Sequence, residues 1–520
     1  MNPRGWPIPL VSLSKFVGAV LVSVTAAAWG QPVSAQVTLP PDLISPKVPH
    51  DVPSGSVASV QDLAIFAWRE FIALNWPARD PATTNVRGRA NPNSDFLTIT
   101  ANRTGTYPLL VWQTYRHKNE LFPAGGPTQS SFDSTAPAYK YVTQPTAAGD
   151  VSYDLFNNLD ESSEIGLCTM FAHKDVRIVY EAKVNRAEFD YANKNGLTNC
   201  SGPNCPTLAD ASLKTSNDLV QYGGICSTDR SIVSLPCGDA AVDRDAGEGA
   251  IEIKAAWRML TDAEMASGRF YTHKVIYYKG GPDTQSGGSQ QYYNAVFGLV
   301  ALHIIHKTKS FPTFVFATWE QVDDFDDASN SNPEDLAFLD LQPPAPNNML
   351  VFATRAHPVH SQIPPVNDAV HAAFKAKAPT TVWQYYKLVG VQAMPMNGPP
   401  PAGAPSDMKS YYYLANIVVE TNNTLQNFFG AAFGGGVPTQ FQNVYLHGAA
   451  GSPFQMGGCQ GCHGAAGQAL GGEMSVLLSS APLNSNSRPE SIDAGPDAAL
   501  RSYLARSAAI LARSAAITRR

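Results

Sequence analysis

Hydrophobic positions near the start of the chain follow the period of a helix. From Val60, apolar residues recur every three or four positions, as on the buried face of a helix. Ser59 is a typical N-cap and Pro77 a typical stop. We therefore predict a helix from Val60 to just before Pro77. Its large aromatic residues, predicted to lie in the core, are Trp68, Phe71 and Trp76.

The pattern changes to that of β-strands between about residues 250 and 320. Apolar and polar residues alternate from Ile251 to Trp257, and residues 270–278 resemble a second strand. Residues 292–307 and 313–319 are apolar on both faces and rich in Val, Ile and Phe, which is typical of central strands. This block is the predicted sheet core of a large domain.

Weaker patterns flank this block. Residues 109–120 fit either a strand or a helix, and His117 beside two cations is predicted to lie on the surface. Residues 176–191 begin as a strand. Further elements are expected as a strand at 349–354, a helix at 366–376, a strand at 381–391, and a strand followed by a helix at 411–429. Residues 321–348 and 395–406 are acidic or Pro-rich and are predicted to be loops.

The composition favours a strand-rich body with many turns, because the chain holds 40 Gly and 40 Pro in 520 residues. Residues 1–35 have the pattern of a secretory signal, with basic residues, an apolar run and a small-residue cleavage site. Cleavage of this signal would remove Arg4 and Lys15, so the formal charge would change from −6 to −8. A negative net charge argues against a nucleic-acid partner. No apolar run in the mature chain has membrane length. We expect a periplasmic or secreted protein.

Five of the seven cysteines are Cys168, Cys200, Cys205, Cys226 and Cys237. The last four fall in a loop-like region, residues 195–240, that is rich in Asn, Gly, Ser and Pro. In an exported protein this crowding favours disulfides. A zinc site is the weaker alternative because the intervals contain no CxxC pair. The pairing stays open, with Cys168 as the expected leftover thiol.

The other two cysteines belong to the segment Gly458-Cys459-Gln460-Gly461-Cys462-His463-Gly464. CxxCH is the arrangement that attaches a c-type haem. The two thiols reach the two vinyl groups of one porphyrin, and the adjacent imidazole of His463 reaches the iron as the proximal ligand. Cys459, Cys462 and His463 are therefore predicted to hold one covalent haem c. The alternative is a small disulfide or half of a zinc site.

The sixth iron ligand decides between electron transfer and chemistry at the iron. Met474 is the only methionine after the motif and is the first candidate. Met456, His447 or a residue of the large domain are further candidates, and Met474 is equally well explained as a core residue.

Two groups of histidines are further candidates for metal ligands. His303 and His306 are three apart on a predicted strand and would point to opposite faces, although His303 alone could face the haem. His357, His360 and His371 match no metal-ligand spacing and are predicted to be ordinary polar residues. At the end of the strand that contains Trp319, we predict that the Trp side chain is packed in the core and that the acidic residues after it are solvated. We find no nucleophile triad, P-loop or dinucleotide fingerprint.

The motif and the export signal resemble those of the c-type cytochrome superfamily. Residues 298–308 and 316–323 are also similar to stretches of exported bacterial proteins that carry one haem motif near the C-terminus. This resemblance implies haem and a periplasmic setting. Small soluble cytochromes c differ in placing the motif early and a ligand Met far beyond it.

The fold class predicted from the sequence is α+β: a large, mainly β domain followed by a small helical, cytochrome c-like haem-binding segment. The expected divisions are a signal peptide (1–35), an extended lead-in (36–58), the large domain (59–430), the haem-binding segment (431–500) and a basic helical tail (501–520). The expected function is one-electron transfer with a redox partner protein. Two alternatives are a peroxidase- or oxygenase-like haem oxidoreductase and a small-molecule-binding haem sensor.

Overall fold

The elements of the computed structural model described here belong to the compact unit Leu39–Arg520. The structure describes residues 37–121, 131–134, 137, 139, 142, 154–162, 169–173, 175–194, 206–242, 247–281, 288–339, 350–394, 399–414, 416–419, 426–427, 444–445, 453–454, 457–479 and 489–493. The predicted signal peptide and basic tail lie outside these residues, as do Cys168, Cys200 and Cys205.

An antiparallel seven-stranded sheet forms the centre of the fold. Its strands run in the order β1-β4-β5-β7-β8-β11, with β6 also paired to β7. They are β1 (Arg116–His117), β4 (Val179–Val184), β5 (Ile251–Arg258), β6 (Thr272–Lys279), β7 (Gln291–His306), β8 (Val315–Gln321) and β11 (Tyr386–Gln392). The four strands predicted between residues 250 and 320 are confirmed, and β7 is central because it pairs with β5, β6 and β8.

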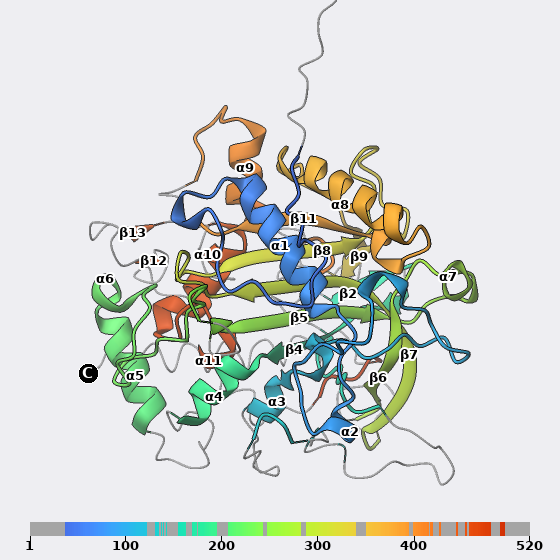
Figure 1. The fold of residues 1–520 in the computed structure, drawn as a ribbon, viewed down its shortest axis with the longest axis horizontal. Helices are drawn as coiled ribbons and strands as arrows, with labels where there is room; N and C mark the ends of the chain where they lie inside the picture. Colours follow the sequence, from blue (N-terminus) through green and yellow to red (C-terminus); the bar gives the residue numbers. More distant parts are fainter. Residues whose placement is uncertain are drawn as a thin grey trace, which may run out of the picture. The chain divides into compact units, whose positions relative to one another are not determined.

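Helices α1 (Val60–Leu74) and α8 (Ile363–Lys377) cover one face of this sheet (Figure 1). The predicted N-cap is confirmed, because the Ser59 side chain accepts from the Asp62 amide in a capping box. Trp68 and Phe71 pack on Trp319 of β8, with ring centres 6.2 and 5.1 Å apart. Aromatic packing therefore fixes α1 on the sheet.

His306 also points to the α1 face. Its imidazole hydrogen-bonds the Glu70 carboxylate of α1 and the main-chain carbonyl of Glu248. Burial alone would lower the pKa of His306, but these two partners raise it above its ordinary value. Since side chains alternate along a strand, His303 points to the opposite face, as predicted.

The opposite face is covered by main chain from late in the sequence. Asn416 donates to the Thr318 hydroxyl at 2.8 Å, and the Ile417 amide donates to Glu320 at 3.0 Å. Lys254 of β5 donates to the Val419 carbonyl at 3.1 Å. This face of the sheet receives the segment that carries the two cysteines of the CxxCH motif.

A second antiparallel sheet has the order β10-β9-β2-β3. Its strands are β2 (Thr169–Ala172), β3 (Val176–Arg177), β9 (Ala337–Leu339) and β10 (Leu350–Phe352), and a short pair joins β12 (Val444–Tyr445) to β13 (Pro453–Phe454). The remaining helices are α2 (Pro81–Thr84), α3 (Lys118–Leu121), α4 (Arg186–Lys194), α5 (Pro206–Asn217), α6 (Leu219–Tyr222), α7 (Asp262–Ser267), α9 (Ser406–Tyr412), α10 (Gly458–Ala466) and α11 (Val476–Ser479). Helices and antiparallel sheets together make an α+β fold.

Several local predictions were wrong, including the loop expected at 321–348, which contains β9. The Cys-rich region is not all loop, because it contains α5 and α6. Residues 406–412 form α9, where the expected strand should have begun at Tyr411. His117 is fully buried and lies 3.4 Å from the Asp160 carboxylate, so it is not a surface residue.

No helix in the described part of the chain is long and apolar enough to cross a bilayer.

Candidate functional site

Helix α10 carries the complete CxxCH motif. Cys459, Cys462 and His463 stand at positions i, i+3 and i+4 and therefore share one side of the helix. Both cysteines are thiols in the structure. Cys459 is buried, with Sγ 3.7 Å from the Leu414 carbonyl oxygen, whereas Cys462 and His463 are half-buried. The second thiol and the imidazole thus remain partly open to the outside of the packed body.

Two buried glutamines hold the start of α10 against the sheet edge. The Gln392 side chain on β11 accepts from the Gln460 amide at 2.9 Å and donates to the Gly457 carbonyl at 3.2 Å. In return, the Gln460 side chain donates to the Ala393 carbonyl at 3.0 Å. Each glutamine offers both a donor and an acceptor, so the pair fixes the position of the helix as well as its distance from β11.

Gly458 lets α10 approach the chain at Leu414. Its φ of +56° is in the left-handed region, and a Cβ there would overlap the Leu414 main chain. Glycine is therefore required at the first residue of the motif helix for two separate reasons.

We expect Gly458→Ala to destabilise the protein by more than the left-handed backbone alone costs, which is about 1–2 kcal/mol. Gly268→Ala is the matched control, because φ is +66° there and a Cβ would meet nothing within 4 Å. Urea unfolding of both variants measures the difference. Equal destabilisation would show that α10 does not pack on Leu414 as described.

His463 is oriented by a hydrogen bond to main chain. Its Nδ1 lies 2.6 Å from the Met474 carbonyl oxygen. A carbonyl only accepts, so Nδ1 carries the proton and Nε2 carries the lone pair. This is the tautomer that binds a metal through Nε2, and a carbonyl partner on the other ring nitrogen is the usual support for such a ligand.

Phe316 and His303 flank the His463 imidazole from the sheet. The ring centre of Phe316 lies 4.9 Å from that of His463 in an edge-on arrangement, and the ring centre of His303 lies 6.4 Å away. Phe316 is also 6.1 Å from His303. The phenyl ring thus lies close to both imidazoles. His303 is a neighbour of His463 on the sheet side, and its role as an iron ligand stays a prediction.

Met474 contacts His463 through its carbonyl group, and its side chain is fully buried. The carbonyl lies on the Nδ1 side of the imidazole, whereas an iron would lie on the Nε2 side. This placement favours a main-chain role for Met474, and its side chain as the distal ligand stays a prediction. Met456 and His447 lie outside the described residues.

A buried ion pair fixes the chain just after the motif helix. Lys307 Nζ lies 2.7 and 2.9 Å from the two carboxylate oxygens of Glu473, and both side chains are almost completely enclosed. Burial lowers the pKa of Lys307 and raises the pKa of Glu473, and the ion pair opposes both shifts. Lys307 directly follows β7, so the pair connects the central strand to the motif segment.

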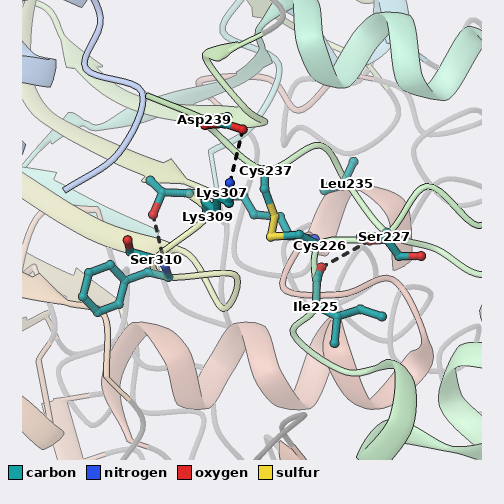
Figure 2. The surroundings of a disulfide bond; sticks show 12 residues. Ile225, Cys226, Ser227, Leu235, Cys237, Asp239, Lys307, Lys309 and Ser310 are labelled. Atoms are coloured by element: carbon teal, nitrogen blue, oxygen red, sulfur yellow. Dashed lines mark hydrogen bonds and ion pairs between the residues drawn. A yellow bond between two sulfur atoms is a disulfide. The ribbon is translucent and has the colours of Figure 1, made fainter. Parts of the chain in front are cut away.

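The same carboxylate is held by a disulfide-closed loop. Glu473 accepts from the Leu235 amide at 2.5 Å, and Leu235 lies within the loop that the Cys226–Cys237 disulfide closes. Figure 2 shows the disulfide with Leu235 and Lys307 around it. The prediction of a disulfide in the Cys-rich region is confirmed for this pair.

The other predicted histidines have separate structural partners. His371 Nε2 lies 2.8 Å from the Tyr386 carbonyl, and His357 Nε2 lies 2.8 Å from the Asn427 side chain. Glu320 at the end of β8 is paired and not solvated, since it is fully buried against Arg355 at 2.6 Å. The prediction of ordinary polar histidines holds for these two, and that of solvated acids is wrong for Glu320.

A cluster that the sequence did not indicate brings together His173, Glu264 and Glu334. Arg258 lies 2.7 Å from Glu264 and 2.6 Å from Glu334, so one guanidinium is paired with both carboxylates. The cluster is therefore a structural ion-pair network. Its members come from distant parts of the chain and leave no local sequence signal.

Comparison of this chain with protein-family models, with curated proteins and with solved structures finds no match. The motif and the contacts of its own residues are therefore the features that indicate a function.

Proposed function

We propose that this protein is a monohaem c-type cytochrome that transfers one electron at a time in the periplasm. The observation that carries the proposal is the His463 contact: a histidine directly after Cys459 and Cys462 has Nδ1 bonded to a main-chain carbonyl, which leaves Nε2 as the metal-binding nitrogen. The residues present fit a covalent haem. The finer division of the fold, with residues 431–500 as a cytochrome c-like segment, belongs to the same proposal.

Each residue has a distinct role in this proposal. The Cys459 and Cys462 thiols would form the thioether bonds, and His463 would supply the proximal nitrogen. When bound, a haem c supplies a one-electron iron couple. The Met474 carbonyl accepts a hydrogen bond from the His463 Nδ1–H group, which makes the imidazole a more basic ligand.

The surrounding body supports the role of an electron carrier. Phe316 closes the flank of His463, and the Lys307–Glu473 pair and the two glutamines hold the segment rigidly against the sheet. A rigid setting reduces reorganisation when charge changes at the site. The Cys226–Cys237 disulfide supports an oxidising compartment. The partner would be another exported redox protein.

The test is the optical spectrum of protein produced together with a c-type haem attachment machinery. We expect a pyridine haemochrome of the c type, one haem per chain, and a low-spin reduced spectrum that carbon monoxide leaves unchanged. Protein without covalent haem would refute the proposal. A high-spin iron that binds carbon monoxide would instead support a haem oxidoreductase with an open iron position.

A further inference from the structure

The Cys226–Cys237 disulfide lies at the surface, although the loop that it closes is bonded to the buried motif segment. Cys226 is exposed and Cys237 is half-buried. A disulfide opens when a thiolate attacks one of its sulfur atoms, so access to the disulfide is the first requirement for its reduction. The exposure of Cys226 allows such an attack on the folded protein.

The chain just after this disulfide is fixed to the end of β7. Gly238 directly follows Cys237. The Gly238 amide donates to the Lys307 carbonyl at 2.8 Å, and its carbonyl accepts from the Lys309 amide at 3.0 Å. Gly238 is buried, and a Cβ there would overlap the His50 carbonyl. The disulfide therefore connects an exposed cysteine to main chain that is packed within the body of the protein.

Leu235 connects this loop to the motif segment. It lies two residues before Cys237 (Figure 2). Its amide donates to the buried Glu473 carboxylate at 2.5 Å. The residue after Glu473 is Met474, whose carbonyl accepts from His463 Nδ1 at 2.6 Å. Two hydrogen bonds and two adjacent residues thus connect the disulfide loop to the imidazole of the motif.

The disulfide limits the freedom of this loop. It joins residues 11 apart in the sequence, and a cross-link of this kind reduces the freedom that the chain gains when it opens. The Ser234 hydroxyl also joins the two sides of the loop, because it accepts from the Ser227 amide at 3.1 Å and donates to the Ile225 carbonyl at 3.2 Å. Neutral hydrogen bonds are weak beside a covalent bond. Opening the disulfide therefore weakens the hold of Leu235 on Glu473.

We propose that Cys226–Cys237 is a thiol–disulfide switch: an exported dithiol protein reduces it, and the motif segment then loosens. A thiolate of the partner attacks the Cys226 sulfur, the S–S bond breaks, and Cys237 leaves as a thiolate that takes a proton from water. The second thiol of the partner then breaks the mixed disulfide and releases Cys226 as a thiol. The partner is oxidised to a disulfide, and two electrons and two protons in all pass to the cysteine pair.

This inference goes beyond the proposed function and does not depend on it. The Leu235–Glu473 contact belongs to the chain itself, so the motif segment loosens on reduction with or without a haem. Where a haem is attached, the same loosening reaches its proximal ligand through Met474, and only this last step rests on the proposed function.

The experiment is hydrogen exchange of the full chain before and after treatment with reduced thioredoxin, a dithiol protein, in the absence of denaturant. Alkylation and peptide mass mapping show whether Cys226 and Cys237 have become thiols. We expect amides in residues 457–479 to exchange about tenfold faster after reduction, because the loss of one hydrogen bond to a charged acceptor has an effect of that size. Amides of α8, on the other face of the sheet, should keep their rates.

The matched control is the double variant Cys226→Ala with Cys237→Ala, in which the loop is permanently open. We expect its motif segment to exchange as fast as that of the reduced wild type, and reduced thioredoxin to cause no further change. A double variant that still responds to thioredoxin would assign the response to other cysteines and overturn the proposal.

Two further results would overturn it: a disulfide that thioredoxin does not reduce until the protein unfolds, and a reduced wild type with unchanged exchange in residues 457–479. Should the double variant not fold, the wild type decides alone. Over a series of thioredoxin concentrations, the faster exchange must then appear together with the Cys226 and Cys237 thiols. Absence of covalent haem overturns the proposed function and leaves this test as it is.

Discussion

Replacing Cys459 and Cys462 together by alanine is expected to abolish the proposed covalent haem attachment while the body of the protein stays folded. The two thiols are the groups that would bind the porphyrin, and neither takes part in the Gln392–Gln460 contacts that hold α10. We expect complete loss of the c-type pyridine haemochrome and of the haem mass in the denatured chain. Urea unfolding of the haem-free wild type and of the variant should differ little.

The control for this experiment is the double variant Cys226→Ala with Cys237→Ala. It also removes two sulfur atoms, but from the disulfide that closes the loop around Leu235. We expect it to lose stability, by about 2–5 kcal/mol, and to retain haem in the chains that fold. A haemochrome of the c type in the Cys459 and Cys462 variant would show that the haem, if present, is attached elsewhere.

Glu473→Gln should destabilise the protein by about 3–5 kcal/mol, because it leaves Lys307 buried without its counter-ion. Local stability should fall most in the motif segment, because Glu473 belongs to that segment and also accepts a hydrogen bond from the Leu235 amide. Urea unfolding gives the free energy, and hydrogen exchange of residues 457–479 shows whether the segment loosens first.

A double-mutant cycle separates the ion pair from simple packing. Lys307→Met with Glu473→Gln removes both charges, and we expect it to recover much of the stability lost in Glu473→Gln alone. Asp42→Asn is the surface control, because the Asp42–Arg69 pair is exposed on the Asp42 side and should matter little. Additive effects of the two buried substitutions would contradict a direct interaction between Lys307 and Glu473.

The sequence predicted the centre of the fold because its signals are local. Strands β5 to β8 were indicated by alternating or continuously apolar residues, and α1 by its period and by Ser59. The position of His117 was not predictable in this way. Its partner Asp160 lies 43 positions away, and burial is set by that long-range contact and not by the adjacent Arg116 and Lys118.

The same distinction holds at the candidate site. The motif Cys459–His463 could be recognised from its spacing alone. The Met474 carbonyl has no sequence signal, because every residue has a carbonyl group. Gln392, Lys307 and Leu235 reach the motif segment from positions 68 to 238 residues away in the sequence, as their hydrogen bonds show. Such contacts depend on the folded arrangement and appear only in the structure.

Burial of Cys459 has a consequence for biogenesis. In the folded protein its sulfur faces the Leu414 carbonyl, and Gly458 is packed against the same residue. If a haem is attached, the attachment enzyme would need both thiols exposed and reduced, whereas an oxidising compartment would also oxidise them. On the proposed function, maturation therefore has a fixed order. Haem would be attached while α10 is still undocked, and α10 would pack on the sheet only afterwards, as a late step of folding.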